Sequence, residues 1–192
     1  MDMVKVQDKL KAFRIPIIGV IILFGIWFLF FRSTGEKGVI PIDEFQNKLK
    51  EYSNGQIVLT DIKEEPSETG GYTFQARYNG FVLTLGLDDD RKVKTDAIVL
   101  VAKKVWGMNE ISIGQYHDLT LSIIRLTNPK LSEKDAQRIL DNELNFNEQI
   151  MTGSDHTTSR NDLYYNLNGG NEKSEFLYFS IFNEEKQYSK SE

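Results

Sequence analysis

The clearest alternation of apolar and polar positions runs through residues 72–87, "YTFQARYNGFVLTLGL". Asn79-Gly80 at its centre is a preferred pair for the two-residue type I′ turn of a β-hairpin. Folding the chain at this pair brings eight apolar side chains onto one face: Tyr72, Phe74, Ala76, Tyr78, Phe81, Leu83, Leu85 and Leu87. A slip of one residue would invert the two faces. The pattern therefore predicts an antiparallel hairpin with one register.

The next stretch, "DDDRK" followed by "VKTDAIVLVAKK", predicts a third strand that continues the meander. Extending the same alternation places four of its residues on the buried face: Val93, Thr95, Ala97 and Val99. The opposite face then carries a smaller apolar strip of Val82, Ile98 and Leu100. Because an apolar strip on a sheet is normally covered, either a helix of this chain or another molecule should lie over it.

Three other stretches repeat apolar residues at steps of three and four, which predicts helices. The first covers residues 41–53, and the second covers residues 115–126. Ser132 with Asp135 resembles a capping box and predicts the start of a third helix. The face that this third helix should bury consists of Ala136, Ile139 and Leu140.

The carboxy-terminal part is rich in aromatic residues and predicts a second hairpin, with strands at 162–167 and 175–182. Alternation sends Phe176, Tyr178 and Phe182 to one face, and Leu177, Phe179 and Ile181 to the other. A core needs only one apolar face. The second face is therefore either buried between layers or exposed as a partner surface. The stretch 147–161 before this hairpin shows no period and is interpreted as a loop.

Together these elements predict an α+β fold, in which an antiparallel sheet carries about three helices on one face. The sheet would combine the meander with the carboxy-terminal hairpin. We expect five parts along the chain: a cytoplasmic tail (1–14), a transmembrane anchor (15–31), a linker (32–40), an extracytoplasmic α+β domain (41–183) and a flexible tail (184–192).

The anchor is predicted from "IPIIGVIILFGIWFLFF", residues 15–31, which contains no charged, amide or hydroxyl side chain. Seventeen helical residues reach about 26 Å, close to the minimum for crossing a bilayer. The 13 Ile, Leu, Val and Phe residues favour insertion by roughly 4–8 kcal/mol. A helix at the surface of a soluble core would keep a polar stripe, and this run has none.

Cleavage as an export signal is the main alternative, because Ser33-Thr34-Gly35 offers small residues where a signal peptidase could cut after Gly35. Against it, the apolar run is longer than the usual apolar region of a signal peptide, and Arg32 lies in the cleavage region. Four basic residues precede the run: Lys5, Lys9, Lys11 and Arg14. By the positive-inside rule, the amino terminus should be cytoplasmic and the domain outside the cell membrane.

Charge and cysteine content narrow the range of functions. Residues 1–31 hold four basic and two acidic side chains, which leaves 19 basic and 26 acidic side chains, a net charge of −7, in the remainder. Binding to nucleic acid or to an anionic lipid surface needs clustered Lys and Arg, so neither is expected of this domain. The chain has no cysteine, which excludes disulfides, thiolate metal sites and a cysteine nucleophile.

The residues that could act in catalysis or bind a metal form only weak patterns. Asp88-Asp89-Asp90 could offer oxygen ligands to calcium, but the spacing of an EF-hand is missing, and a solvated turn is the preferred interpretation. His156 lies beside Ser154 and Asp155, but no constrained turn presents the serine as a nucleophile. The only other histidine, His117, falls in a predicted helix. We therefore predict no catalytic residue, no metal site and no cofactor.

The sequence favours a non-enzymatic binding or assembly module, anchored in the membrane of a bacterial cell envelope. Its partner would be an envelope protein, for example a component of a secretion or conjugation assembly, while residues 15–31 contact lipid. The possible partner surface combines the two apolar strips: Val82, Ile98, Leu100, Leu177, Phe179 and Ile181. The alternatives are an extracytoplasmic domain that binds a small ligand and, less favoured, an envelope hydrolase.

Overall fold

The computed structural model describes residues 39–68, 70–103, 110–169 and 176–183. The predicted cytoplasmic tail, the anchor at 15–31, nearly all of the linker and the tail at 184–192 lie outside the described residues. Within these ranges, no helix has the length and hydropathy that spanning a bilayer requires.

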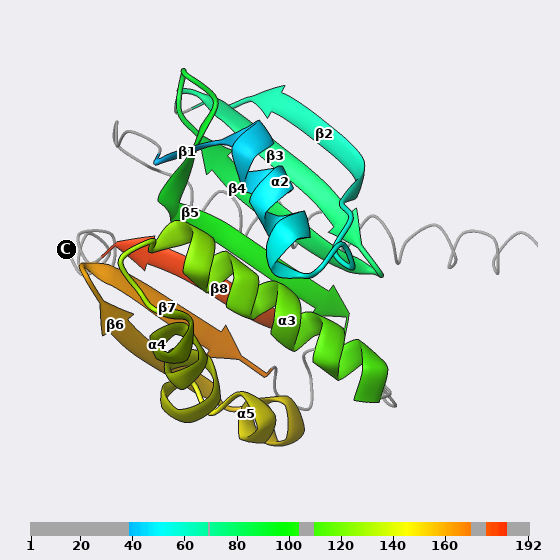
Figure 1. The fold of residues 1–192 in the computed structure, drawn as a ribbon, viewed down its shortest axis with the longest axis vertical. Helices are drawn as coiled ribbons and strands as arrows, with labels where there is room; N and C mark the ends of the chain where they lie inside the picture. Colours follow the sequence, from blue (N-terminus) through cyan, green and yellow to red (C-terminus); the bar gives the residue numbers. More distant parts are fainter. Residues whose placement is uncertain (1–38, 69, 104–109, 170–175, 184–192) are drawn as a thin grey trace, which may run out of the picture. The chain divides into compact units, whose positions relative to one another are not determined.

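An antiparallel sheet with helices on one face forms the described part of the chain, which confirms the α+β fold class (Figure 1). The elements in chain order are β1 (Ile40–Pro41), α2 (Ile42–Tyr52), β2 (Thr60–Pro66), β3 (Tyr72–Tyr78), β4 (Phe81–Leu87), β5 (Lys92–Lys103), α3 (Glu110–Thr127), α4 (Glu133–Arg138), the π-helical turn η1 (Ile139–Glu143), α5 (Phe146–Thr152), β6 (Asp155–Arg160), β7 (Leu163–Asn168) and β8 (Phe176–Asn183). The 8-stranded sheet has the order β2-β3-β4-β5-β8-β7-β6, and the short strand β1 pairs with β5.

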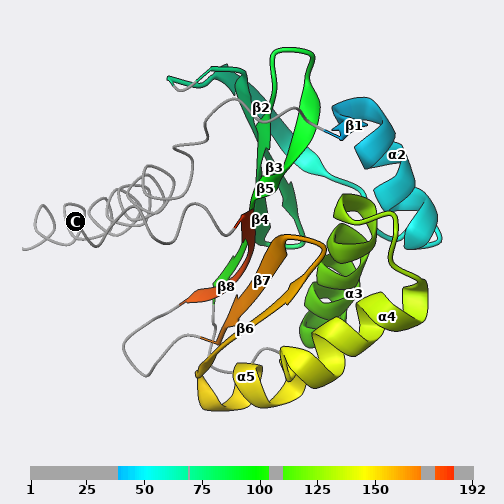
Figure 2. The same cartoon turned by 90° about the vertical axis from the view of Figure 1, so that its left-hand side faces the viewer.

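The order of strands divides the domain into two halves. In each half, helices precede an antiparallel meander: α2 precedes β2–β5, and α3 to α5 precede β6–β8. The last strands of the two halves, β5 and β8, pair with each other at the centre of the sheet. Figure 2 shows the helices together on one side of the sheet. We call this side the inner face and the opposite side the outer face.

The hairpin predicted at residues 72–87 is confirmed in its register. Tyr78 pairs with Phe81 and Tyr72 pairs with Leu87, at the two ends of an unbroken ladder between β3 and β4. Asn79 and Gly80 both have positive φ angles, +48° and +86°, as a type I′ turn requires. The second predicted hairpin is confirmed as the antiparallel pair β7 and β8.

The predicted faces of β5 are wrong at Ile98, Val99 and Leu100, because the ladder between β4 and β5 contains a bulge. Leu87 pairs with Val93, but Leu85 pairs with Ile98, so β5 advances five residues while β4 advances two. Because five and two differ by an odd number, residues of β5 after the bulge lie on the face opposite to the one that simple alternation predicts. Ile98 and Leu100 therefore lie on the inner face, where both are 0% exposed.

All three predicted helices are present. The first two lie at the predicted residues, and the third begins at its predicted cap. Residues 41–53 contain α2, and residues 115–126 lie within the longer α3. The Ser132 Oγ accepts a hydrogen bond of 3.1 Å from the Asp135 N–H at the start of α4. The residues predicted for the buried face of this helix are all fully buried: Ala136, Ile139 and Leu140.

The prediction of a loop at residues 147–161 is wrong, since the segment contains most of α5 and all of β6. The α5 helix has only seven residues, too few for a clear period. The sequence of β6, "DHTTSR", is polar on both faces and alternates only between exposed and half-buried side chains. Neither element carries the hydrophobic pattern that predicts secondary structure.

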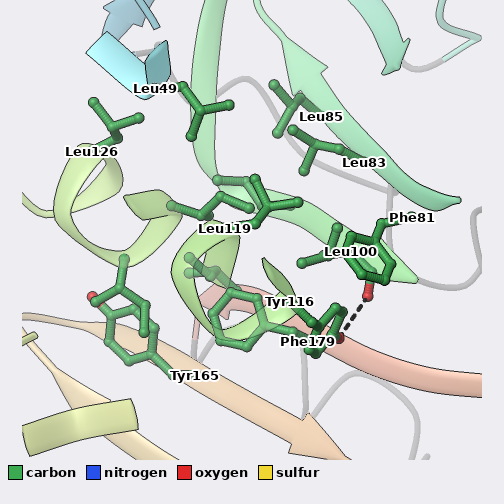
Figure 3. Close-up of a cluster of buried hydrophobic side chains, with 14 of the residues drawn as sticks. Leu49, Phe81, Leu83, Leu85, Leu100, Tyr116, Leu119, Leu126, Tyr165 and Phe179 are labelled. Carbon is green, nitrogen blue, oxygen red and sulfur yellow. Dashed lines mark hydrogen bonds between the residues drawn. The ribbon is translucent and has the colours of Figure 1, made fainter. Parts of the chain in front are cut away.

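The core lies between the inner face and the helices. Figure 3 shows Leu49 of α2 and Tyr116 and Leu119 of α3 gathered with side chains of the sheet, Leu83 of β4 and Phe179 of β8 among them, in one buried cluster. The ring of Tyr116 is fully buried and packs against two other rings, those of Phe81 at 5.4 Å and Phe146 at 6.1 Å between centroids. One aromatic cluster thus joins the two halves of the domain.

Alkaline conditions should destabilise the chain through Tyr116. Burial raises the pKa of its phenol, so above about pH 10 the unfolded chain ionises while the folded chain keeps the proton. The stabilisation is complete below the pKa of the unfolded tyrosine. It then falls by about 1.4 kcal/mol per pH unit as the pH rises toward the folded pKa. Urea unfolding at a series of alkaline pH values measures this slope. Tyr116→Phe should remove its share, and an unchanged slope in that variant would contradict the assignment.

Candidate functional site

The structure divides the six predicted partner-surface residues between core and outer face. Five of them lie on the inner face and are at most 1% exposed: Ile98, Leu100, Leu177, Phe179 and Ile181. They form core contacts beneath the helices, so the prediction that they line an exposed surface is corrected for these five. Val82 alone lies on the outer face, where it pairs with Val101 and is half-buried.

The outer face carries an apolar group of its own, which we call the outer apolar patch and define as Val82, Val99, Val101, Tyr178 and Phe182. Strand pairing brings these residues together from β4, β5 and β8. Val101 is opposite both Val82 and Tyr178, and Val99 lies next to Val101 on the same face of β5. The ring of Phe182 stacks on the ring of Tyr164, 5.6 Å away between centroids.

The helices among the described residues all lie on the other side of the sheet, so none of them covers the outer apolar patch (Figure 2). Even so, Val99, Val101 and Phe182 are each at most 8% exposed to solvent. An antiparallel sheet covered on one side normally alternates apolar and polar residues, with a solvated second face. The two apolar faces of β5 and β8 depart from that pattern. Val82 and Tyr178 are the half-buried members of the outer apolar patch, and these two make it the candidate binding surface.

Polar side chains adjoin the outer apolar patch and set its chemistry. Strand pairing sets Thr84, Ser180 and Asn166 in one row across the sheet. Thr84 of β4 and Ser180 of β8 both pair with Val99 of β5, and Asn166 of β7 pairs with Ser180. The Asn166 Nδ2 donates to the Thr157 Oγ1 at 3.0 Å and to the Asp155 Oδ1 at 2.5 Å. An apolar centre beside neutral hydrogen-bonding groups suits the binding of a protein surface. The patch contains no acid, base or nucleophile.

His117 lies in a polar cluster on the helical side. Its Nε2 lies 2.7 Å from the Asp141 Oδ1 on η1, and its Nδ1 lies 3.4 Å from the Asp118 Oδ1. The edge of the ring packs against Phe146, 4.9 Å away between centroids. The arrangement links α3 to η1 and α5, which is a structural role.

The acidic turn predicted to be solvated serves to connect two turns of the sheet. The Asp88 Oδ1 accepts from the N–H groups of Asp90 and Lys92, and the Asp89 Oδ1 accepts from the Gly71 N–H at 3.0 Å. These carboxylates thus bond to backbone donors. In the described ranges, no three His, Asp or Glu residues are grouped so that they could hold a metal ion.

His156 lies on β6 rather than in a loop, and its neighbours in sequence form their hydrogen bonds with other residues. The Ser154 Oγ lies 2.9 Å from the Thr152 Oγ1, and the Asp155 carboxylate accepts from Asn166. Within the described residues of this segment, no chain of hydrogen bonds joins the serine, the histidine and the acid. The geometry therefore adds no support for a nucleophile at Ser154.

Sequence reasoning missed Val99 and Val101 as outer-face residues, although it placed Tyr178 and Phe182 together correctly. The missing information is the bulge in the ladder between β4 and β5, which no turn residue in "VKTDAIVLV" marks. Comparisons with protein-family models, with curated proteins and with solved structures find no match to this chain.

Proposed function

We propose that the protein is a non-enzymatic binding or assembly module, anchored in a bacterial cell membrane by residues 15–31 and acting outside the cytoplasm. The outer apolar patch is the observation that carries the proposal. The core beneath the helices explains why the inner face is apolar. Val82, Val99 and Val101 lie outside that core, so packing against α2 and α3 gives no reason for their apolar side chains. Binding to an apolar segment of another envelope protein supplies that reason.

The anchor supports a partner in the same membrane. Residues 32–38 separate the apolar run from the first described residue, so the tether spans at most about 25 Å when fully extended. A module held this close to the lipid meets membrane proteins at high effective concentration, which allows a small patch to act with low intrinsic affinity. The net charge of −7 beyond residue 31 disfavours the lipid surface itself as the ligand.

Site-specific crosslinking in intact cells tests this proposal. A photoreactive amino acid at Val82, on the outer face, should crosslink the full-length chain to one envelope protein, through an apolar segment that mass spectrometry identifies. The matched control is Gln137, which is exposed on α4, on the helical side. The crosslink should appear at Val82 and not at Gln137.

Two results would contradict the proposal. The first is a Val82 variant that yields no more crosslinked product than the Gln137 variant. The second concerns the compartment: protease added to intact protoplasts should digest the domain, and a carboxy-terminal domain that survives would place it in the cytoplasm.

A further inference from the structure

The two edges of the sheet differ in how they are protected against pairing with another strand. The edge strand β2 has the features that prevent such pairing. Its register shifts between Thr60 and Lys63, Asp61 has a left-handed φ of +50°, and Pro66 ends the strand. Charged side chains also follow one another along it, at Lys63, Glu64 and Glu65.

The opposite edge strand, β6, has none of these features in its middle. It pairs with β7 without a shift over all six residues, from Asp155 to Arg160. Its four central residues, "HTTS", contain no proline, lysine or carboxylate, and threonine is favoured in strands. The charges stand at the two ends, negative at Asp155 and positive at Arg160.

The backbone of β6 directs alternate residues away from β7. Asn161 and Asp162 both have positive φ, +54° and +67°, so a type I′ turn closes the hairpin on Arg160 and Leu163 as a hydrogen-bonded pair. At the other end, the Gly169 N–H donates to the Ser154 carbonyl at 2.9 Å. Even-numbered residues of β6 therefore bond to β7, and the backbone groups of Asp155, Thr157 and Ser159 point outward.

Contacts on the helical side hold β6 in place. The Thr158 Oγ1 donates to the Glu143 Oε2 at 2.7 Å, and Arg160 forms an ion pair with the same carboxylate. The Arg160 Nη1 also donates to the Ser159 carbonyl at 2.6 Å, which covers one end of the edge. In the described part of the chain, no contact from a side chain or another strand covers the outward backbone groups of Asp155 and Thr157. The edge is thus held on its helical side and open at its centre.

We propose that β6 of one chain pairs antiparallel with β6 of a second copy, about a two-fold axis at Thr157. In this register Thr157 lies opposite Thr157 of the second copy, and Asp155 lies opposite Ser159 of the second copy. All are outward-facing residues, so the backbone groups can exchange hydrogen bonds. No like charges face each other, whereas parallel pairing would bring the two Asp155 side chains together. The contact is isologous and closes as a dimer.

Cysteine crosslinking tests the pairing directly, because the natural chain has no cysteine. Directly opposite residues in a hydrogen-bonded pair have Cα atoms about 5.5 Å apart, within the range of a disulfide. Mild oxidation of full-length Thr157→Cys in membranes should give a species of twice the 22.1 kDa chain mass that reducing agent reverses. The control is Ile62→Cys on the opposite edge, where the side chain is 49% exposed; it should stay at the mass of one chain.

A second change separates strand pairing from random collision. Ser159→Pro removes an outward N–H and leaves the bonds of β6 to β7 intact. In the Thr157→Cys background, it should abolish the doubled-mass species, while circular dichroism checks that the chain stays folded. If this variant unfolds, the comparison between Thr157→Cys and Ile62→Cys decides alone. Equal yields at the two edges, or a crosslink from Cys at 157 to a different protein, would overturn the proposal.

Discussion

Leu100→Ala should lower the free energy of unfolding by about 2–5 kcal/mol, the usual cost of truncating a fully buried leucine. Leu100 is 0% exposed on the inner face of β5, and its carbonyl oxygen lies 3.5 Å from the Tyr116 hydroxyl. The substitution leaves a cavity between the sheet and α3. Urea unfolding of the full-length chain in detergent, followed by circular dichroism, measures the loss.

Val82→Ala is the matched control for Leu100→Ala, since alternation in the sequence placed both residues on one strip. Val82 is half-buried on the outer face, away from the core. Its truncation should cost only about 1 kcal/mol or less. Equal losses for the two variants would mean that the bulge between β4 and β5 is absent and that the two residues share a face.

Gly71→Ala should be the most damaging single-methyl change in the turn between β2 and β3. Gly71 has a φ of +73°, a conformation that costs an alanine about 1–2 kcal/mol. A Cβ at this position would also lie 2.1 Å from the Leu87 carbonyl oxygen, so the backbone itself must move. Such overpacking adds about 1–3 kcal/mol. The total should therefore reach roughly 2–5 kcal/mol by urea unfolding.

The neighbouring glycine separates the two causes. Gly70 has a similar φ of +90°, but nothing lies within 4 Å of a Cβ built there. Gly70→Ala should therefore show only the conformational cost, about 1–2 kcal/mol. If the two alanine variants unfold at the same urea concentration, close packing of Gly71 against β4 is contradicted. The turn matters because the Gly71 N–H also bonds to Asp89 in the turn between β4 and β5.

The parts of the fold that follow from local sequence were predictable. Asn79-Gly80 sets both the turn and the register of its hairpin, and Ser132 caps α4 through its own side chain. Such signals lie within a few residues of the structure that they determine. The same holds for the alternation in β8, which correctly separates Phe179 from Phe182.

The features that depend on distant contacts were not predictable. The bulge in β5 follows from the simultaneous pairing of Val93 with Leu87 and of Ile98 with Leu85. The polar strand β6 exists because β7 offers it a ladder and Glu143 holds its side chains. The candidate site shares this limit, because alternation alone could not decide which of the two apolar faces of β8 belongs to the core.

The pairing of β5 with β8 has a consequence for the newly made chain. The central ladder pairs Ile98 of β5 with Ile181 of β8, so it cannot form until β8 has been synthesised. The first meander therefore leaves the ribosome with an apolar strand at its edge. At about 5–20 residues per second, the 73 residues from Lys103 to Phe176 take roughly 4–15 s to synthesise. During that interval the apolar edge of β5 has no partner strand from β8, and a chaperone that shields β5 would raise the yield of native molecules.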